Sequence, residues 1–332
     1  MLPLLRFSPI LKRARWGGRA LGTRLNKRVG PEADYSESWE IVDLQENQSR
    51  TIDAQGKEHL LHDLFVNSRE ELLGSKECSG SRFPLLLKFL DASDRLSVQV
   101  HPNDEQANLL QLGEWGKTEA WVILEAAPDA VVYAGLIPGT TLEQLQRELA
   151  SGNVAALLQE IRVKRGDCLL IPAGTVHAVG AGVMLLEIQQ SSDLTYRLYD
   201  WGWTDADGNP RPLHLQQALQ CIDPELRPLF ISGESAAPSL ETGIKEEKLV
   251  DCDYFEMRRV RVTGDEAIQN SGMRIWSVME GEGELRAGEQ REKVRVGDTV
   301  MIPAATKRFE VLSANGLEVI ETRPGNGNRG RG

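Results

Sequence analysis

A short pattern that occurs twice constrains the fold of this 332-residue chain more than any other feature. Residues 166–175 read GDCLLIPAGT and residues 297–306 read GDTVMIPAAT, so that glycine, aspartate, isoleucine, proline, alanine and threonine coincide. In each copy a Gly-Asp turn leads into an apolar run of strand length, which ends at a turn containing proline. Because a repeated strand-and-turn unit indicates related domains, we expect two β-barrels.

The two copies differ just after the shared pattern. The first copy continues to His177, whereas Arg308 occupies the corresponding position of the second. A lone histidine is usually a packing residue, but His177 becomes a candidate metal ligand when other ligands are grouped with it. We therefore predict that only the first barrel holds a metal.

Such ligands occur upstream, in the stretch SVQVHPNDEQANLLQLGEWGKTEAW. Gln99 and His101 are two positions apart, as are Lys117 and Glu119, so on a strand both members of each pair leave the same face. An imidazole and a carboxylate on facing strands can share a divalent ion, and His177 would be the third ligand. A site with nitrogen and oxygen donors and no cysteine can hold any of several divalent metals, Mn, Fe and Co among them.

Charged residues within apolar segments indicate a polar cavity nearby. Lys88 interrupts the run FPLLLKFL, and a buried ammonium is costly unless it is paired. Lys88 therefore either faces solvent on an edge strand or reaches into the site, and we expect residues 83–101 to form a hairpin that brings it near. Residues 189–200 are dense in polar and aromatic side chains, and we expect Glu187 and Arg197 to face the cavity.

Composition and charge exclude several classes of partner. The hydrophobic fraction of 41% and charged fraction of 26% are ordinary for a soluble protein. The longest apolar runs fall short of the ~20 residues that span a bilayer, which argues against a membrane protein. The net charge is −11, and none of the 49 acidic residues lies in residues 1–30, which carry eight lysines or arginines. An acidic body of this kind argues against nucleic acid as the partner.

The basic first segment and the cysteines bear on the cellular location. The segment is rich in arginine, but it lacks a long apolar run, and Pro3 and Pro9 would interrupt an amphipathic helix, so we expect no targeting role. Its cluster at 12–15 could contact an anionic substrate, although a solvated face is the favoured interpretation. The cysteines lack CxxC spacing, which predicts reduced thiols and a cytoplasmic location. They are Cys78, Cys168, Cys221 and Cys252.

Other segments predict elements around the barrels. Residues 59–76 predict one or two short helices, and Thr140 with Glu143 predicts a capping box that opens another helix. The histidines outside the candidate site are expected to be structural, namely His59, His62 and His214.

A change of character after residue 205 suggests how the chain divides. Prolines punctuate a polar region up to residue 243, which predicts a crossing between domains. We expect a metal-binding barrel with helical additions at 1–240, a second, metal-free barrel at 241–325 and a disordered tail at 326–332.

The motifs of the first two hundred residues resemble those of one enzyme family. GDxxxIPAGTVHA, with a histidine and a glutamate on earlier strands, resembles the cupin superfamily, and the finer details resemble type I mannose-6-phosphate isomerases of the short bacterial kind. The resemblance implies a mainly β fold with two cupin-type jelly-roll barrels and a few short helices covering the first. One departure is ADYSESWE, where the family usually has a glycine before the glutamate. The matching motifs are WGG at 16–18, ESWE at 37–40, SVQVHPND at 97–104, GKTEAW at 116–121, IPAGTVHAVGAG at 171–182 and LEIQQSSDLTYRLYDW at 186–201.

The resemblance also implies a zinc site and a sugar-phosphate pocket. The implied reaction interconverts mannose 6-phosphate and fructose 6-phosphate through a cis-enediol, and Arg197 would stabilise the enediolate charge. Lys88 and Lys117 are candidates for phosphate binding or proton transfer, and both tasks stay open for each. The family's single zinc would be held by Gln99, His101, Glu119 and His177; the catalytic set falls on Arg197, Lys117, Lys88 and Glu187, and the substrate-binding set on Ser97, Lys88 and Lys117.

Two alternatives keep the fold and change the function. The chain could be another cupin isomerase, for instance one acting on glucose 6-phosphate. It could also be a metal-dependent sugar-phosphate binding protein that has lost catalysis. The partner is a small sugar phosphate in each case, and we expect a monomer or a weak homo-oligomer.

Overall fold

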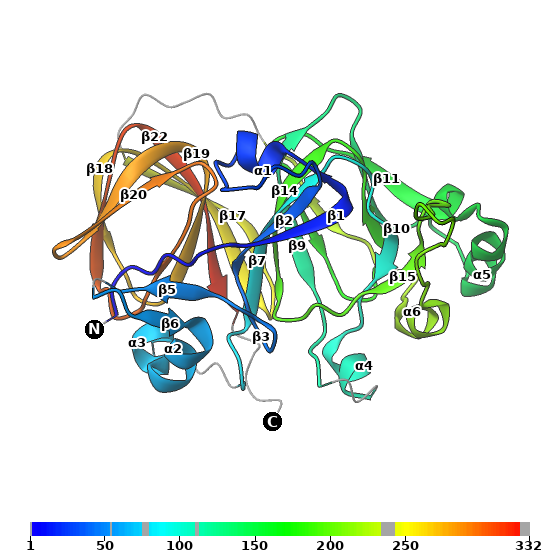
Figure 1. Cartoon of the computed structure of the whole chain (residues 1–332), viewed down its shortest axis with the longest axis horizontal. Helices are drawn as coiled ribbons and strands as arrows, with labels where there is room; N and C mark the ends of the chain where they lie inside the picture. The colour runs from blue at the N-terminus through cyan, green and yellow to red at the C-terminus, as the bar shows by residue number, and fades with distance from the viewer. Residues whose placement is uncertain (1, 54, 75–79, 110–112, 234–242, 326–332) are drawn as a thin grey trace.

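Two β-barrels lie side by side in the computed structural model of the chain (Figure 1). The first barrel is built from strands before residue 233, and the second from strands after residue 242. Within the described residues, no helix is long and apolar enough to cross a membrane. The structure describes residues 2–53, 55–74, 80–109, 113–233 and 243–325. Cys78 and the predicted tail at 326–332 lie outside these ranges.

The first barrel consists of two sheets that face each other. Their inner faces share one apolar cluster, in which Trp121 and Leu169 of the larger sheet join Val132 and Val179 of the smaller. The larger sheet has the order β1 (Ile10–Gly18), β2 (Tyr35–Ile41), β7 (Leu85–Ala92), β14 (Val183–Gln190), β9 (Glu119–Ala126), β12 (Cys168–Ile171) and β16 (Leu229–Ile231). The smaller has the order β11 (Leu158–Arg162), β10 (Val131–Leu136), β13 (His177–Val179), β8 (Val98–Val100) and β15 (Tyr196–Tyr199).

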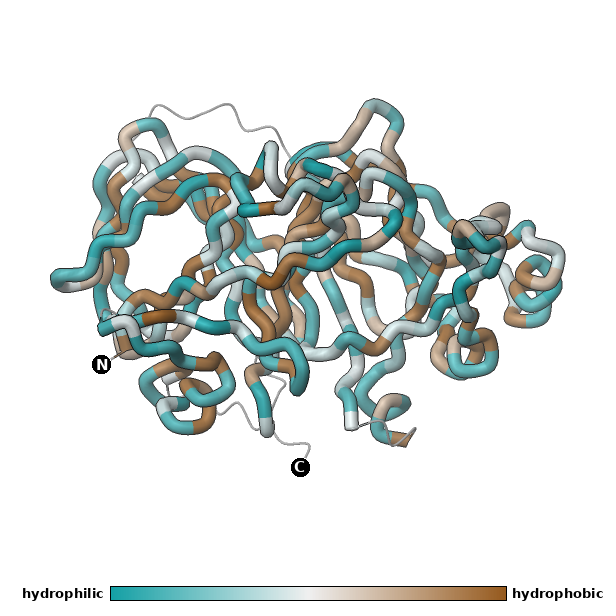
Figure 2. Tube along the Cα trace, viewed as in Figure 1, coloured by the Kyte–Doolittle hydropathy of each residue, from teal (hydrophilic) through white to brown (hydrophobic). Residues whose placement is uncertain are grey.

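The central strands of the larger sheet are buried along their whole length. Every residue of β7 and of β14 is buried, because one face lines the first barrel and the other packs against the second. Leu87 and Phe89 of β7 belong to the same core cluster as Met301 and Ile320 of the second barrel. The two barrels therefore share a core, visible as hydrophobic strands between them in Figure 2.

The predicted hairpin over residues 83–101 is wrong. β7 pairs with β2 and β14, whereas β8 pairs with β13 and β15 in the other sheet. The physical reason is burial: an apolar strand covered on both faces belongs at the centre of a sheet, so the chain crosses to the other sheet after Ala92. Lys88 is consequently buried inside the barrel and does not face solvent at an edge.

The second barrel repeats the strand pairing that surrounds the sequence pattern of the first. In the first barrel Ile171 of β12 lies opposite Glu119 of β9, and in the second Ile302 lies opposite Arg274. The repeated pattern thus occupies equivalent places in both barrels. The strands of the second barrel are β17 (Gly243–Asp251), β18 (Phe255–Gln269), β19 (Arg274–Ala287), β20 (Gln290–Arg295), β21 (Thr299–Ile302) and β22 (Arg308–Pro324).

The first residues of the chain pack on the second barrel before entering the first. Leu5 exchanges two backbone hydrogen bonds of 2.9 Å with Met301, and the Leu4 amide donates to Gln290 Oε1 at 2.6 Å. Farther along, Lys27 Nζ donates to the carbonyl oxygen of Gly297 and forms a buried ion pair with Glu40, both at 2.6 Å. The basic first segment is thus held by both barrels.

Short helices and hairpins complete the fold. The predicted helices at 59–76 form as two, and Ala304 of the second barrel donates its amide to Leu72 O of the second of them. Two helices lie beyond the smaller sheet of the first barrel, at the right of Figure 1. The helices are α1 (Ala20–Thr23), α2 (Leu61–Asn67), α3 (Arg69–Leu73), α4 (Asp104–Leu109), α5 (Leu142–Ser151), the 3-10 turn η1 (Val154–Leu157) and α6 (Leu215–Cys221); β3 (Asp43–Leu44) pairs with β4 (Asn47–Gln48), and β5 (Arg50–Ile52) with β6 (Glu58–Leu60).

The capping box that opens α5 lies one residue later than predicted. Thr141 Oγ1 accepts from the Gln144 amide at 3.2 Å, and Gln144 Oε1 accepts from the Thr141 amide at 2.9 Å. Thr140 is unavailable as the cap because its own amide closes the preceding turn by donating to Ile137 O. The motif is therefore Thr141 with Gln144, and the predicted pair Thr140 and Glu143 is wrong.

Candidate metal centre

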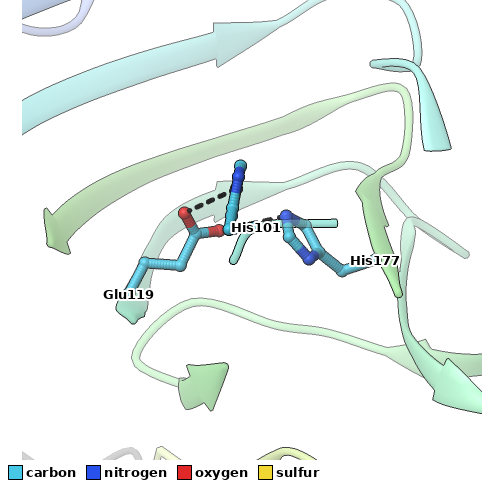
Figure 3. A group of neighbouring side chains, drawn as sticks. All are labelled: His101, Glu119 and His177. Carbon is cyan, nitrogen blue, oxygen red and sulfur yellow. Dashed lines mark ion pairs between the residues drawn. The ribbon is translucent and has the colours of Figure 1, made fainter. Parts of the chain in front are cut away.

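Three side chains of the first barrel converge on one point (Figure 3). One potential ligand atom from each of His101, Glu119 and His177 lies within 4.8 Å of the others. His101 Nε2 is 3.3 Å from Glu119 Oε2, and His177 Nε2 is 3.3 Å from Glu119 Oε1. All three side chains are at most 1% exposed.

Both sheets contribute to this group. His177 begins β13 and Glu119 begins β9, so that the histidine and the carboxylate project toward each other across the barrel. His101 directly follows β8, where its carbonyl oxygen accepts from the Gly174 amide at 2.8 Å. The repeated turn at 172–175 thereby holds the loop that carries His101.

Backbone carbonyl groups fix the tautomer of both histidines. His101 Nδ1 lies 2.8 Å from Leu194 O, and His177 Nδ1 lies 2.9 Å from Thr175 O. An imidazole that donates from Nδ1 leaves the Nε2 lone pair for another partner. His177 Nε2 is buried and has no hydrogen-bond partner within the described residues.

The electrostatics keep these groups in the forms that a cation prefers. Burial, and then Lys117, lowers the pKa of His101 to about 3, and burial also lowers the pKa of His177. Both imidazoles are therefore neutral at neutral pH. Burial alone would raise the pKa of Glu119, but Lys117 and the histidines outweigh it and hold that pKa well below its usual value.

Lys117 lies within the same group. Its Nζ is 2.7 Å from Glu119 Oε2, 3.1 Å from His101 Nε2 and 3.4 Å from Glu187 Oε1. Trp121 donates from Nε1 to the other oxygen of Glu119 at 3.0 Å. Each oxygen of the Glu119 carboxylate therefore faces one hydrogen-bond donor, Lys117 or Trp121, and one imidazole.

A second lysine continues the chain of buried charges. Lys88 Nζ lies 3.2 Å from Glu187 Oε1 and 3.6 Å from Glu37 Oε2. Burial opposes protonation of Lys88, but Glu187 and Glu37 outweigh it and raise the pKa of the lysine. Burial, reinforced by Glu119, raises the pKa of Glu187. Glu37 was not predicted as a site residue, although it lies in the ESWE motif two positions before Trp39.

The remaining predicted residues lie along one row of the smaller sheet. His177 is directly opposite Gln99, and Gln99 is directly opposite Arg197, so their side chains leave the same face. Arg197 Nε donates to Ser97 Oγ at 3.3 Å, and its Nη1 donates to Pro212 O at 2.9 Å. The structure thus connects Lys88, Lys117 and Glu187 to the three converging residues, and places Ser97, Gln99 and Arg197 beside them.

The other histidines have partners elsewhere, in line with the structural role expected for them. His59 pairs with Asp53 at 2.8 Å, and His62 pairs with Asp43 at 3.1 Å. His214 Nδ1 accepts from the backbone amide of Arg197 at 3.1 Å, which ties α6 to β15.

The second barrel holds an internal ion pair at the equivalent positions. Arg274 takes the place of Glu119, and Glu321 lies opposite Trp276 as Glu187 lies opposite Trp121. Arg274 Nη1 donates to Glu321 Oε2 at 2.9 Å, and Trp276 Nε1 donates to the same oxygen at 2.8 Å. A guanidinium therefore stands where the first barrel gathers its metal-ligand candidates.

Comparison with known proteins identifies the family. Residues 4–147 match the model of the phosphomannose isomerase type I catalytic domain, and residues 245–321 match that of the mannose-6-phosphate isomerase cupin domain. Mannose-6-phosphate isomerase ManA of Bacillus subtilis is 38% identical over 92% of this chain and 94% of its own length.

Solved structures agree with the family models. The crystal structure of the Bacillus subtilis mannose 6-phosphate isomerase has a TM-score of 0.81 and 29% identity, covering 97% of this chain and 100% of that one. A mannose 6-phosphate isomerase bound with zinc and yttrium has a TM-score of 0.74, over 97% and 100% of the two chains, and at 17% identity it supports the fold alone. The predicted mainly β, cupin-type fold is confirmed. The chain belongs to the type I mannose-6-phosphate isomerase family.

Proposed function

We propose that this chain interconverts mannose 6-phosphate and fructose 6-phosphate at a zinc ion held by Gln99, His101, Glu119 and His177. The observation that carries the proposal is the buried group of two neutral imidazoles aimed at one carboxylate. The proposal is also supported by the relative from Bacillus subtilis, which is named as a mannose-6-phosphate isomerase.

The donor set fits a divalent metal. Both histidines offer Nε2, Glu119 offers a carboxylate, and the unpartnered Nε2 of His177 is a buried polar atom that a metal would satisfy. One carboxylate leaves the assembled site with net positive charge. When bound, the metal would act as a Lewis acid that polarises the sugar oxygens. Two imidazoles and one carboxylate are a common donor set for zinc, which we therefore propose over Mn, Fe or Co.

We assign proton transfer between C1 and C2 to the group formed by Lys88, Glu187 and Lys117. Glu187 lies between the two lysines, at 3.2 Å and 3.4 Å, so a proton can pass among them without leaving the barrel. The pKa of Glu187 is raised toward neutral pH, and a general acid or base works best when its pKa is close to the working pH. The intermediate of this transfer would be a cis-enediol.

Arg197 is assigned to the developing negative charge on the substrate oxygen. Burial, and then the nearby Arg211, lowers the pKa of Arg197, yet a guanidinium remains protonated at neutral pH. Its hydrogen bond to Ser97 sets its orientation on the row that contains Gln99. A fixed cation of this kind stabilises an enediolate more than it stabilises the neutral sugar.

A coupled assay tests the reaction. The purified chain, reconstituted with zinc, should convert mannose 6-phosphate to fructose 6-phosphate. Faster turnover of glucose 6-phosphate would identify the other cupin isomerase, and binding without exchange of the C2 proton into solvent would identify an inactive binding protein. Absence of turnover after metal reconstitution would contradict the proposal.

Metal analysis tests the ligands. His177→Ala should lose zinc, whereas His62→Ala should keep it, because His62 pairs with Asp43 away from the group. Equal zinc content in both variants would show that the ligand assignment is wrong. We also propose one zinc per chain, since Arg274 takes the place of Glu119 in the second barrel.

We further propose that the enzyme works in the cytoplasm as a monomer or weak homo-oligomer. Cys168 and Cys221 are buried free thiols, which fits a reducing compartment. Fractionation and size-exclusion chromatography would measure location and size, and a stable large assembly would contradict the second part.

A further inference from the structure

Two arginines from distant parts of the chain share one buried carboxylate at the edge of the first barrel. Arg211 donates from Nε and Nη2 to the two oxygens of Asp200 at 2.7 Å and 2.8 Å. Arg15 of β1 donates from Nη2 to Asp200 Oδ1 at 2.9 Å. Both guanidinium groups also lie over the Trp203 ring, 5.2 Å and 5.8 Å from its centroid. The two cations are therefore held in fixed positions.

A third guanidinium lies close to this pair. Arg197 is three residues before Asp200, and within the described part of the chain it has no carboxylate partner. Besides burial, Arg211 lowers the pKa of Arg197, and Arg15 does so more weakly, which places all three guanidinium groups within electrostatic reach of one another.

Positive charge is in excess here. Asp200 pairs with Arg15 and Arg211, and Arg15 also pairs with the exposed Asp94 at 3.1 Å. Among the described residues, three guanidinium groups are therefore accompanied by two carboxylates. Like charges held close together repel one another and destabilise the free protein, and an anion that binds between them relieves this repulsion. The cluster is thus suited to an anionic ligand.

The buried lysines of the site are poorly placed for the same task. The side chains of Lys88 and Lys117 are 8% and 3% exposed, and each already pairs with carboxylates inside the barrel. A phosphate dianion brought to them would meet Glu37, Glu119 and Glu187 at short range. By contrast, Arg15 is 15% exposed and Arg211 is 28% exposed, so both can be reached from solvent.

We propose that Arg15 and Arg211, oriented by Asp200, bind the phosphate group of the substrate. Arg197 and Ser97 then lie between this phosphate site and the metal-ligand candidates, since Arg197 is opposite Gln99 in the sheet. A guanidinium matches phosphate oxygens with two parallel hydrogen bonds, which an isolated ammonium cannot do. The inference rests on the proposed function, and it frees Lys88 and Lys117 for proton transfer.

The test compares single substitutions, so that Asp200 keeps one arginine partner in each variant. Arg211→Gln and Arg15→Gln should each raise the KM for mannose 6-phosphate by about tenfold or more, because each loses a charge-assisted contact. The kcat should change by less than about threefold, since neither side chain belongs to the group assigned to proton transfer. Arg13→Gln is the matched control: Arg13 is on the same strand but pairs with Asp34.

Inorganic phosphate supplies a second readout that does not depend on catalysis. The wild-type chain should bind phosphate by calorimetry, and the Arg211→Gln variant should bind it about tenfold more weakly or worse. Arg211→Lys should recover part of the loss because it restores the charge. If the wild type binds phosphate through these residues but does not isomerise, the proposed function fails and the anion site stands.

The opposite results would overturn the phosphate site. One is an unchanged KM and unchanged phosphate affinity in both variants. Another is a fall in kcat and melting temperature with KM unaltered, which indicates that the arginines only stabilise the fold. Arg211 is the more exposed of the two, so its variants keep the proposal testable if Arg15→Gln does not fold.

Discussion

The buried ion pair of the second barrel allows a quantitative prediction. In the variant Arg274→Met, Glu321 loses the donor at 2.9 Å but keeps Trp276 at 2.8 Å and Arg323 at 2.7 Å. Breaking a buried pair by removing one partner costs about 3–5 kcal/mol. Because Arg323 still neutralises the carboxylate, we expect the lower end, about 3 kcal/mol of unfolding free energy.

The loss should depend on pH. Burial alone would raise the pKa of Glu321, but Arg274 and Arg323 outweigh it, so the pKa in the folded protein lies below its usual value. Stability from such a group is present above the unfolded-state pKa, about 4.3, and is lost as the pH falls through the folded-state pKa. Removing Arg274 raises the folded-state pKa. The difference between wild type and variant should therefore shrink as the pH is lowered from 7 toward 4.

Urea unfolding of both proteins at several pH values is the assay. Two barrels can unfold in separate steps, so fluorescence and isomerase activity should be followed together. The double variant Arg274→Met with Glu321→Gln should recover part of the loss, because it no longer buries an under-compensated charge. A cost below about 1 kcal/mol at pH 7, or one that does not change with pH, would refute the reasoning.

Three further predictions concern other parts of the molecule. Gly297→Ala should destabilise the protein by about 2 kcal/mol more than Gly288→Ala in thermal unfolding. Both glycines have positive φ, but of the two only Gly297 would place its new Cβ against backbone, 2.3 Å from Leu25 O. Equal losses of stability would contradict this. Glu37→Gln should lower kcat about tenfold with zinc content unchanged, because it removes one of the carboxylates that hold Lys88; loss of zinc would count against it. Burial raises the pKa of Cys168 to about 12, so this thiol should resist Ellman's reagent at pH 8 until the protein unfolds, as mass spectrometry of the labelled protein can establish.

The sequence was informative where function depends on residues at short, regular spacing. Gln99 with His101 and Lys117 with Glu119 are two positions apart, a spacing that strand geometry places on one face. In the structure Gln99 lies in β8 and Glu119 begins β9, whereas His101 and Lys117 lie just outside these strands. The repeated pattern located His177 relative to its strand in the same way. These signals are local, so the grouping around the metal-ligand candidates could be predicted before the fold was known.

Pairings between distant segments left no such signal. Asp200 joins Arg15 to Arg211, and its first partner is 185 positions away in the sequence. The hairpin prediction failed for the same reason: neighbouring strands in the sequence entered different sheets once both faces of β7 were covered. Only tertiary packing decides which face of a strand meets which partner.

The contact between the first residues and the second barrel has a consequence for the order of folding. Leu4 and Gln290 are separated by 286 positions, and Leu5 pairs with Met301, so the amides of Leu4 and Leu5 lack these partners until nearly all of the chain has been synthesised. Contacts of such long range carry a loop-closure cost and slow the folding of β proteins. We expect the amide of Leu5, which donates to Met301, to become protected late when refolding is followed by pulsed hydrogen exchange, and early protection would contradict this. During synthesis, Leu4 and Leu5, which leave the ribosome before β1, would be among the last residues to reach their hydrogen-bond partners.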